Sequence, residues 1–457
     1  MKCKFKTTLT GGEKYECPRD AEEGGDYCIF HCDKENFTEK EINEFENKFW
    51  EDFERRENDK KLEEFNFTGF KFPDKFSFEN REFKKPVNFR YAKFGDNANF
   101  RYAKFGSEAN FWDAEFGNMA NFLDAEFGNK TIFLDAEFGS EANFEVAKFG
   151  DNAYFFGTKF GDKANFWKAK FGSEANFEVA IFGNKANFGG ARFGNKANFM
   201  NAKFGNKANF ELAEFGNKAN FRSATLQKAN LKNADLLDAE LTGTKLQNAN
   251  IYLAKIENSQ NLQYAKLDED YIVINEKDGD KEKDTNKKLE KYNEAHDIYI
   301  TLKNYFSKVG RYDLSGKYFI QEWRVKGKID KVNEKYFSWF GNHLIDYFSE
   351  YGESWWKVLA SAGGIIFLFA TAYFLLNAIT PIPCIEPTLT KCLAYKPPII
   401  ERILESIYFS IVSFTTLGYG DFHPKPGLFQ LIAATEAFIG MFIMAFFTIT
   451  VARKIMR

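Results

Sequence analysis

Four cysteines and one histidine lie close together at the start of this 457-residue chain: Cys3, Cys17, Cys28, Cys32 and His31. Thiolate and imidazole groups are common ligands of a tetrahedral Zn²⁺ site, and such a site can hold a short, loop-rich segment together. We therefore expect residues 1–40 to bind Zn²⁺ through the four cysteines, with His31 as an alternative to Cys32. Free thiols in a reducing compartment are the other interpretation of the same residues.

A second group of chemically informative residues is the sequence ThrThrLeuGlyTyrGlyAsp at positions 415–421. Gly418 and Gly420 permit backbone angles that a side chain would forbid, so successive carbonyl oxygens can point to one side. Irregular backbone is tolerated at membrane depth only where protein buries it or water lines it. The elements on either side must therefore supply that setting.

The flanking elements are apolar. Residues 358–378 carry no charge over 21 positions, and residues 427–452 carry one acid, Glu436, before the basic end of the run. Both runs are long enough to cross a bilayer as helices, whereas residues 399–414 are too short to do so. We expect an outer helix, a short re-entrant helix, the segment 415–421 and an inner helix.

This arrangement resembles the two-transmembrane potassium channels over about 100 residues, 358–457. The usual filter of that family is ThrValGlyTyrGly, so Leu417 replaces Val here. The resemblance implies a homotetramer in which four chains surround K⁺ with a selectivity filter made of Thr416, Leu417, Gly418, Tyr419 and Gly420. Because only the backbone carbonyl of position 417 lines the pore, we expect selectivity to survive this replacement.

The resemblance also implies residues that support the filter. Thr415, Asp421 and Tyr408 are expected to do so. The family often places an aromatic donor thirteen residues before the acid, and here that position is Tyr408. We therefore expect a hydrogen bond between the Tyr408 hydroxyl and the Asp421 carboxylate.

The inner helix carries four further residues of interest. Gly440 matches the hinge glycine of the family, although a packing glycine is an equal alternative. Met444 and Thr448 lie one turn apart beyond it and are expected to line the cavity. Glu436 is expected to be a buried structural acid near the short helix.

Phenylalanine occurs 55 times, and most of these residues follow a repeat. From Phe67 to Phe221 the steps alternate between five and six residues, which gives an 11-residue period, and a leucine or isoleucine every five residues follows from Leu226. An 11-residue period can indicate a right-handed coiled coil, but one glycine in each period would penalise a helix. Alanine precedes nearly every central residue by two positions, so both would point inward from an extended strand.

The sequences AlaAsnLeu at 229–231 and AlaAspLeu at 234–236 resemble the pentapeptide-repeat family, and the resemblance covers about 200 residues. It implies a right-handed quadrilateral β-helix over residues 67–267. The repeats suffice for nine to ten coils. The extra residue after each glycine predicts coils of 22 residues in which glycine supplies unusual backbone angles.

The chain is therefore expected to be multidomain. Its other predicted parts are a charged helical connector at 41–66, a charged linker at 268–290, an α-helical hairpin at 291–330 and an interfacial aromatic helix at 331–357, before the pore domain at 358–457. The rod would attach through the hairpin to the outer helix and not to the inner helix. The lipid bilayer is the expected surroundings of the pore domain.

Charge and cysteine positions predict the topology. Arg453, Lys454 and Arg457 follow the inner helix, which favours a cytoplasmic C-terminus, and two spans then place the N-terminus in the cytoplasm of a plasma-membrane protein. The first residues contain no apolar stretch, so no secretory signal is expected. Cys384 and Cys392 would lie on the opposite side, where they could form a disulfide or remain thiols.

These features favour one function and leave one alternative. The net charge of −3 argues against a nucleic-acid partner. The sequence contains no P-loop, nucleophile elbow or pair of catalytic acids on a defined frame, so an enzyme is not expected. We expect a passive K⁺-selective channel whose cytosolic rod serves assembly, binding of a cytosolic partner or gating. A membrane-anchored interaction scaffold with a vestigial pore is the alternative.

Overall fold

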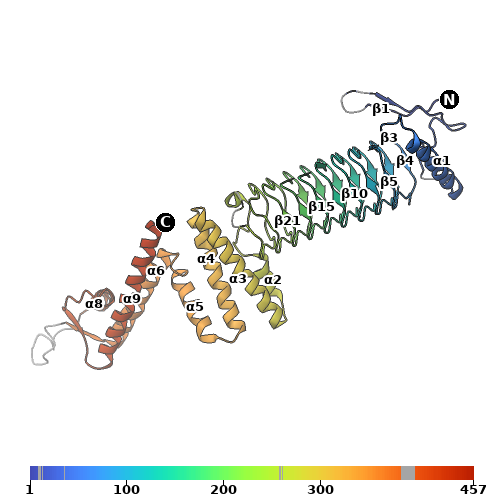
Figure 1. Cartoon of the computed structure of the whole chain (residues 1–457). Coiled ribbons are helices and arrows are strands. Elements are labelled where there is room, and N and C mark those ends of the chain that lie inside the picture. The colour runs from blue at the N-terminus through green and yellow to red at the C-terminus, as the bar shows by residue number, and fades with distance from the viewer. Residues whose placement is uncertain are drawn as a thin grey trace, which may run out of the picture. The chain divides into compact units, whose positions relative to one another are not determined.

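The computed structural model describes residues 1–8, 12, 14–34, 37–256, 259, 261–381 and 397–456. These residues divide between two compact units, Met1–Val309 and Gly310–Arg457. The first unit holds a long solenoid of short parallel strands, and the second is mainly helical (Figure 1).

The solenoid is built from two- and three-residue strands that stack coil upon coil. They are β3 (Phe65–Asn66), β4 (Lys71–Phe72), β5 (Glu82–Phe83), β6 (Val87–Asn88), β7 (Lys93–Phe94), β8 (Lys104–Phe105), β9 (Glu115–Phe116), β10 (Glu126–Phe127), β11 (Glu137–Phe138), β12 (Lys148–Phe149), β13 (Ala153–Tyr154), β14 (Lys159–Phe160), β15 (Lys170–Phe171), β16 (Glu174–Asn176), β17 (Ile181–Phe182), β18 (Arg192–Phe193), β19 (Lys196–Asn198), β20 (Lys203–Phe204) and β21 (Glu214–Phe215).

The parallel register gives the length of each coil. Phe94 pairs with Phe72 below and Phe116 above, a step of 22 residues, whereas Asp235 bridges Lys255 at a step of 20 in the leucine-rich part. Two sheets contain seven strands each, and isolated bridges continue one of them as far as Lys245↔Lys266. The predicted β-helix and its 22-residue coil in the phenylalanine repeats are confirmed.

Phenylalanine rings fill the solenoid as columns along its axis. Phe144 is completely buried, and its ring stacks on Phe122 at 4.7 Å and on Phe166 at 4.8 Å, nearly parallel to both. Aromatic rings attract one another at such separations in addition to the effect of burial. Each ring is buried only because a coil lies above and below it, so stacking of the coils stabilises the solenoid.

The repeat glycines have a different role from the predicted one. Gly95 and Gly117 do not have a positive φ; ordinary residues such as Asn97 (φ 61°) and Tyr102 (φ 57°) take the left-handed positions. A Cβ atom on Gly95 would lie 2.7 Å from the backbone nitrogen of Asp74 in the coil below. Glycine is therefore required because adjacent coils approach closely, and the prediction of unusual glycine angles was wrong.

Two elements cover the first coil. The hairpin of β1 (Lys6–Thr8) and β2 (Lys14–Glu16) belongs to the N-terminal segment, and α1 (Glu39–Asn58) follows it. The helix starts at a capping box, in which Thr38 and Glu41 bond each other's backbone. The helix lies at the N-terminal end of the solenoid (Figure 1), and its buried face carries Phe45, Phe49 and Phe53, which contact rings of the first coils.

The other end of the solenoid is covered by helices where a charged linker was expected. After a short 3₁₀ turn, η1 (Leu262–Tyr264), come α2 (Ile274–Lys281) and α3 (Thr285–Lys308). The Tyr305 hydroxyl accepts a hydrogen bond from the Leu262 amide at 3.1 Å, and Lys232 forms an ion pair at 3.1 Å with the buried Glu294. These contacts fix α3 on the last coils, so this segment is part of the first unit.

The second unit contains α4 (Tyr312–Val332), α5 (Tyr336–Ser349), α6 (Trp355–Leu376), α8 (Ile399–Phe414) and α9 (Leu428–Met456), with a small antiparallel pair, β22 (Ile379–Pro381) and β23 (Phe422–Pro424). Helices α6 and α9 are long and apolar enough to cross a membrane, with mean hydropathies of 2.0 and 1.9. Helix α8 lies between them in sequence and packs on both.

Helices α3 and α4 follow each other in the part of the chain predicted as a helical hairpin, residues 291–330. Helix α3 belongs to the first unit and α4 to the second, and α4 packs against α5. Arg324 donates two hydrogen bonds to Asp346, at 2.9 and 3.0 Å, and Asn342 donates one to the Trp323 carbonyl at 2.9 Å. The apolar residues of α3 are used by the solenoid end and α2, which the local spacing of 291–330 does not reveal.

Candidate functional site

The segment predicted as the filter begins where helix α8 ends. Thr415 caps that helix, and the backbone then takes a positive φ at every second residue: Thr416 (56°), Gly418 (53°) and Gly420 (78°). Alternating handedness rotates successive peptide planes so that their carbonyls can face one side, as a ring of cation ligands requires. The two glycines thus adopt the angles for which their lack of a side chain suits them.

The two threonines of this segment form hydrogen bonds to nearby carbonyls, whereas its two large side chains are exposed. The Thr415 hydroxyl donates to the Ile411 carbonyl at 2.7 Å and the Thr416 hydroxyl to the Thr415 carbonyl at 2.7 Å. Leu417 and Tyr419 are 59% and 68% exposed in the single chain. The segment thus presents two large side chains that the described residues of this chain do not cover.

Tyr408 lies near the end of this segment, where Asp421 and Phe422 follow Gly420. The Tyr408 ring meets the Phe422 ring edge to face at 6.1 Å. Phe422 belongs to β23, which pairs with β22 after the outer helix. The ring contact thus joins Tyr408 to the residue after Asp421, in a strand pair that the sequence did not indicate, and the hydrogen bond between Tyr408 and Asp421 stays a prediction.

Glu436 joins all three membrane-associated helices. It is completely buried on α9, where it accepts a hydrogen bond from the Tyr373 hydroxyl of α6 at 2.6 Å and contacts the Ser410 hydroxyl of α8. Ser410 also lies 2.9 Å from the Ile366 carbonyl. Glu436 therefore links α9 to α6 through one hydroxyl and to α8 through another.

The geometry of Gly440 favours packing over a hinge. A Cβ atom there would lie 2.0 Å from the Phe414 carbonyl oxygen, so the last residue of α8 rests directly on the inner helix. Met444 and Thr448 are exposed in the single chain, and the Thr448 hydroxyl donates to the Met444 carbonyl at 2.9 Å. The position of α8 thus depends on a glycine beneath its C-terminal end.

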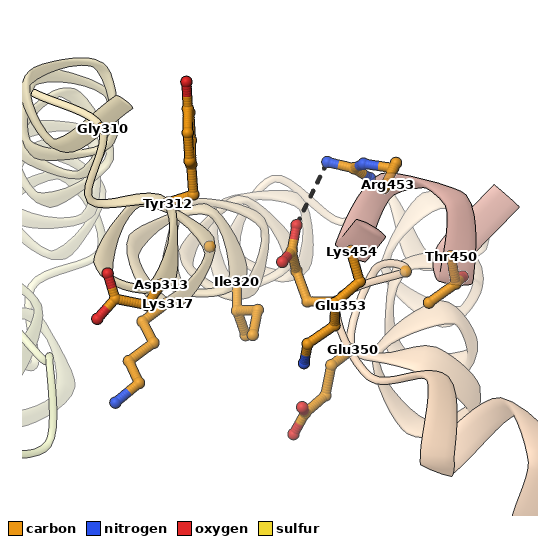
Figure 2. A pocket seen from close by; sticks show the side chains of 12 residues that line it. Gly310, Tyr312, Asp313, Lys317, Ile320, Glu350, Glu353, Thr450, Arg453 and Lys454 are labelled. Atoms are coloured by element: carbon orange, nitrogen blue, oxygen red, sulfur yellow. Dashed lines mark hydrogen bonds and ion pairs between the residues drawn. The ribbon is translucent and has the colours of Figure 1, made fainter. Parts of the chain in front are cut away.

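The end of the inner helix meets residues that were not predicted to be functional. Acidic and basic side chains both line a cavity of about 550 Å³. At this cavity Arg453 of α9 donates a hydrogen bond to Glu353 at 3.3 Å (Figure 2). The Arg453 guanidinium also lies 5.6 Å from the Phe319 ring of α4. Gly352, in the turn before α6, lies against the same end of α9. Residues that precede the outer helix α6 in sequence therefore contact the end of the inner helix α9.

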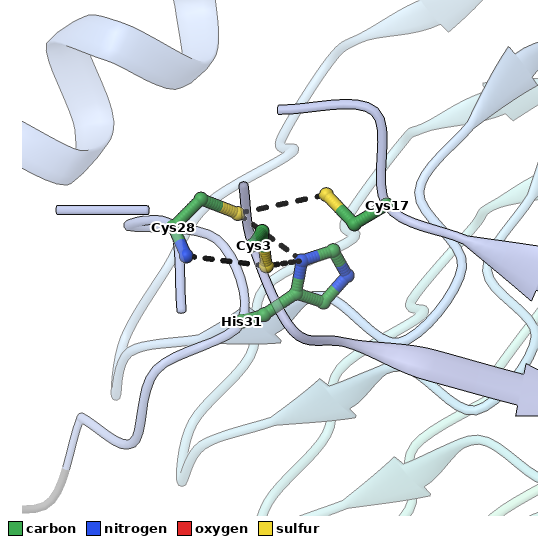
Figure 3. A group of neighbouring side chains, drawn as sticks. All are labelled: Cys3, Cys17, Cys28 and His31. Carbon is green, nitrogen blue, oxygen red and sulfur yellow. Dashed lines mark hydrogen bonds between the residues drawn. The ribbon is translucent and has the colours of Figure 1, made fainter. Parts of the chain in front are cut away.

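The N-terminal ligand group converges as predicted, except for one member. Cys3, Cys17, Cys28 and His31 are all buried, with their ligand atoms within 4.8 Å of one another (Figure 3). Cys32 lies outside this group, because its thiol contacts the Ile29 carbonyl and the Lys34 ammonium, at 3.5 and 3.3 Å. His31, the predicted alternative, takes the fourth position.

The electrostatics of this group follow from the same contacts. The contact with the Cys28 thiol, and then that with His31, lowers the pKa of the Cys17 thiol. Burial lowers the pKa of Lys34, against the influence of Cys32 beside it. The predicted disulfide between Cys384 and Cys392 lies outside the described residues.

Comparisons with known proteins agree with these two parts. The family described as "Ion channel" matches residues 364–457, and families described as "Pentapeptide repeats" match residues 78–126 and 217–258. Neither kind of family is an enzyme family.

Two individual proteins are also similar to parts of this chain. "Two pore potassium channel a" of Oryza sativa subsp. japonica is 41% identical over 52 residues, which are 11% of this chain and 15% of that protein. This chain thus spans about 15% of the length of the curated relative it matches. The crystal structure of HetL, a pentapeptide repeat protein from the cyanobacterium Nostoc, is 18% identical with a TM-score of 0.23, covering 49% of this chain and 96% of that one. The chain thus has two helices able to span a membrane in the part that matches the ion channel family, residues 364–457, and a solenoid that matches the pentapeptide-repeat families.

Proposed function

We propose that the protein is a K⁺-selective channel that conducts K⁺ passively as a homotetramer. One observation carries the proposal: the backbone of residues 416–420 alternates in handedness directly after a short helix, between two apolar helices. That backbone can offer carbonyl oxygens in place of the water around a K⁺ ion, with the Thr416 hydroxyl at its inner end. The potassium channel relative supports this choice of ion.

Four copies are proposed because one chain supplies only one side of an ion cage. The exposed Leu417 and Tyr419 side chains would pack against neighbouring copies, and Met444 and Thr448 would line the cavity below the filter. In this arrangement the Tyr408 hydroxyl holds Asp421 at the outer mouth. Gly440 would then act by seating the short helix on the inner helix.

We place the channel in the plasma membrane with both termini in the cytoplasm. The basic end of α9, with Arg453 and Lys454, favours the cytoplasmic side. Helix α5 suits the membrane interface, because apolar side chains such as Phe337, which is 94% exposed, alternate with polar ones. The solenoid is then a cytosolic domain, available for assembly or for an as yet unknown cytosolic partner.

The same orientation suggests how cytosolic helices reach the gate. Arg453 at the end of the inner helix bonds Glu353 (Figure 2), and its guanidinium lies over the Phe319 ring of α4, so a displacement of the α4–α5 hairpin would pull on this end. A Zn²⁺ ion bound by the N-terminal cysteines and His31 would stabilise the solenoid end of the chain and not the pore, since these ligands lie in the first unit.

The test is flux in vesicles reconstituted with the full chain. We expect K⁺ to pass in strong preference to Na⁺ and Ba²⁺ to block it. Equal permeability to the two ions would reject the selective filter. Complete absence of flux from correctly assembled tetramers would favour the alternative function, an interaction scaffold with a vestigial pore.

The proposed role of the contact between Arg453 and Glu353 in gating has its own test. We expect Glu353→Gln and Arg453→Gln to change the open probability in the same direction. The double variant should change it no more than either single variant, because both remove one interaction. Lys357→Gln, which affects the neighbouring Glu350 at 2.8 Å, is the matched control. Independent, additive effects of the two substitutions would contradict the coupling.

A further inference from the structure

We propose that Cys3, Cys17, Cys28 and His31 bind one structural Zn²⁺ ion that fixes the N-terminal segment onto the open end of the solenoid. These four residues come from three places in the segment and meet in one buried site (Figure 3). Cys32, a neighbour of His31 in sequence, is not a ligand. The site is separate from the pore, and its test does not depend on conduction.

The distances between the ligand atoms fit a tetrahedron around a metal. Zinc–sulfur bonds of about 2.3 Å and zinc–nitrogen bonds of about 2.0 Å give tetrahedral edges of about 3.8 Å between sulfurs and about 3.5 Å between sulfur and nitrogen. Cys17 Sγ and Cys28 Sγ are 3.8 Å apart. His31 Nδ1 lies 3.7 Å from Cys3 Sγ and 3.1 Å from Cys28 Sγ. Three sulfurs and one nitrogen are a common structural zinc set.

The histidine is oriented for this role by a second contact. His31 Nε2 lies 3.0 Å from the Thr68 carbonyl oxygen. A carbonyl can only accept, so Nε2 carries the proton and Nδ1 keeps a free electron pair directed at the sulfurs. Such hydrogen bonds from the second nitrogen are typical of histidines that bind metals. The Cys28 amide also donates to Cys3 Sγ at 3.3 Å, which stabilises a thiolate.

The same ligands are bound to the first coil of the solenoid. Thr68 belongs to that coil, and the next residue, Gly69, leaves space for the Phe5 ring, which a Cβ atom there would overlap at 1.9 Å. Phe5 in turn stacks on the His31 imidazole at 4.0 Å. The Phe30 carbonyl accepts a hydrogen bond from the Lys71 amide at 2.7 Å. A metal at this site would therefore hold the covering segment on the edge that the first coil exposes.

The first coil of the solenoid needs such a covering segment. The first coil of a solenoid has no coil beneath it, and its unpaired strand edge and apolar interior must be covered. The N-terminal segment is short and contains two strands of three residues, which cannot bury a sizeable core. Metal binding can contribute the folding free energy that such a segment lacks.

The experiment measures metal content of the purified full chain in detergent. We expect about one zinc per chain, and Co²⁺ taken up in its place should show thiolate charge-transfer and tetrahedral d–d bands. Cys17→Ser and His31→Ala should lose nearly all of the metal. Cys32→Ser is the matched control and should keep it, together with the Co²⁺ spectrum.

Hydrogen exchange tests the docking role on the wild-type chain. Removal of the metal by a chelator should speed exchange at the Lys71 amide, which bonds Phe30, and leave the Lys148 amide inside the rod unchanged. A wild-type chain that contains no zinc and takes up no Co²⁺ would overturn the proposal. So would an equal loss of metal in Cys32→Ser, or unchanged exchange at Lys71 after the metal has been removed.

Discussion

The solenoid and the second unit, Gly310–Arg457, which we call the pore unit, bury their aromatic residues in different ways. Inside the solenoid, rings such as Phe144 are completely covered by the coils above and below. In the second unit, Phe367 of α6 is 71% exposed, and Leu417 and Tyr419 of the proposed filter are more than half exposed. The solenoid is thus complete within one chain, whereas the pore unit is completed by lipid and, in our proposal, by three further copies.

This difference separates what a substitution can reveal. A change in the solenoid core should act on the stability of one chain, and its effect should not depend on assembly. A change in the filter should act on a structure that only several chains form together, so a small strain in each chain is multiplied. Each region therefore needs its own measurement.

The largest effect is expected at Gly418. Its φ of 53° lies in the left-handed region, and Gly418→Ala would add a side chain there in every copy around the pore. A left-handed residue with a Cβ costs about 1 kcal/mol or more, so strain in four chains should reduce selective K⁺ flux at least tenfold. Ion flux in reconstituted vesicles measures this. Leu417→Val, which restores the family's filter sequence, is the control and should keep the flux; normal selectivity in Gly418→Ala would contradict the filter geometry.

Phe144→Ala is expected to give the largest loss of stability in the solenoid. It removes a fully buried ring that stacks on Phe122 and Phe166, and such deletions cost about 3–5 kcal/mol. Chemical unfolding followed by circular dichroism gives the free energy. Phe156→Ala, at a ring that is 37% exposed, is the matched control and should cost clearly less. Similar costs at the two positions would show that burial within the coils does not determine the stability.

The sequence predicted the solenoid well because each coil contacts only its neighbours, so a short period contains the whole packing pattern. The role of Gly95 was missed because it depends on the distance to Asp74 in another coil. The packing of α3 on α2 and of α4 on α5 was not predicted, because the spacing of apolar residues marks a helix but not its partner. Spacing alone likewise could not decide between His31 and Cys32, which are adjacent and differ only in where the fold directs their side chains.

A smaller effect is expected at Gly440, and it sharpens the comparison within the pore unit. Gly440→Ala would place a Cβ 2.0 Å from the Phe414 carbonyl, and overpacking of this kind costs about 1–3 kcal/mol. The thermal midpoint of the detergent-solubilised protein should fall, together with K⁺ flux. Gly363→Ala on the outer helix, where the described structure has no atom within 4 Å, is the control. A flexible hinge would give the opposite pattern, with flux altered and the midpoint unchanged.

The smallest effect is expected on the solenoid surface, where lysines pair with glutamates of the adjacent coil. Lys159 lies 2.7 Å from Glu137, but both side chains are more than half exposed, so water and salt screen their attraction. Lys159→Gln should leave the unfolding midpoint within experimental error of the wild type, at low and at high salt. A clear loss of stability that disappears in salt would instead mean that pairs between coils act as a network. The stability of the solenoid would then come from its charged surface as well as from its aromatic columns.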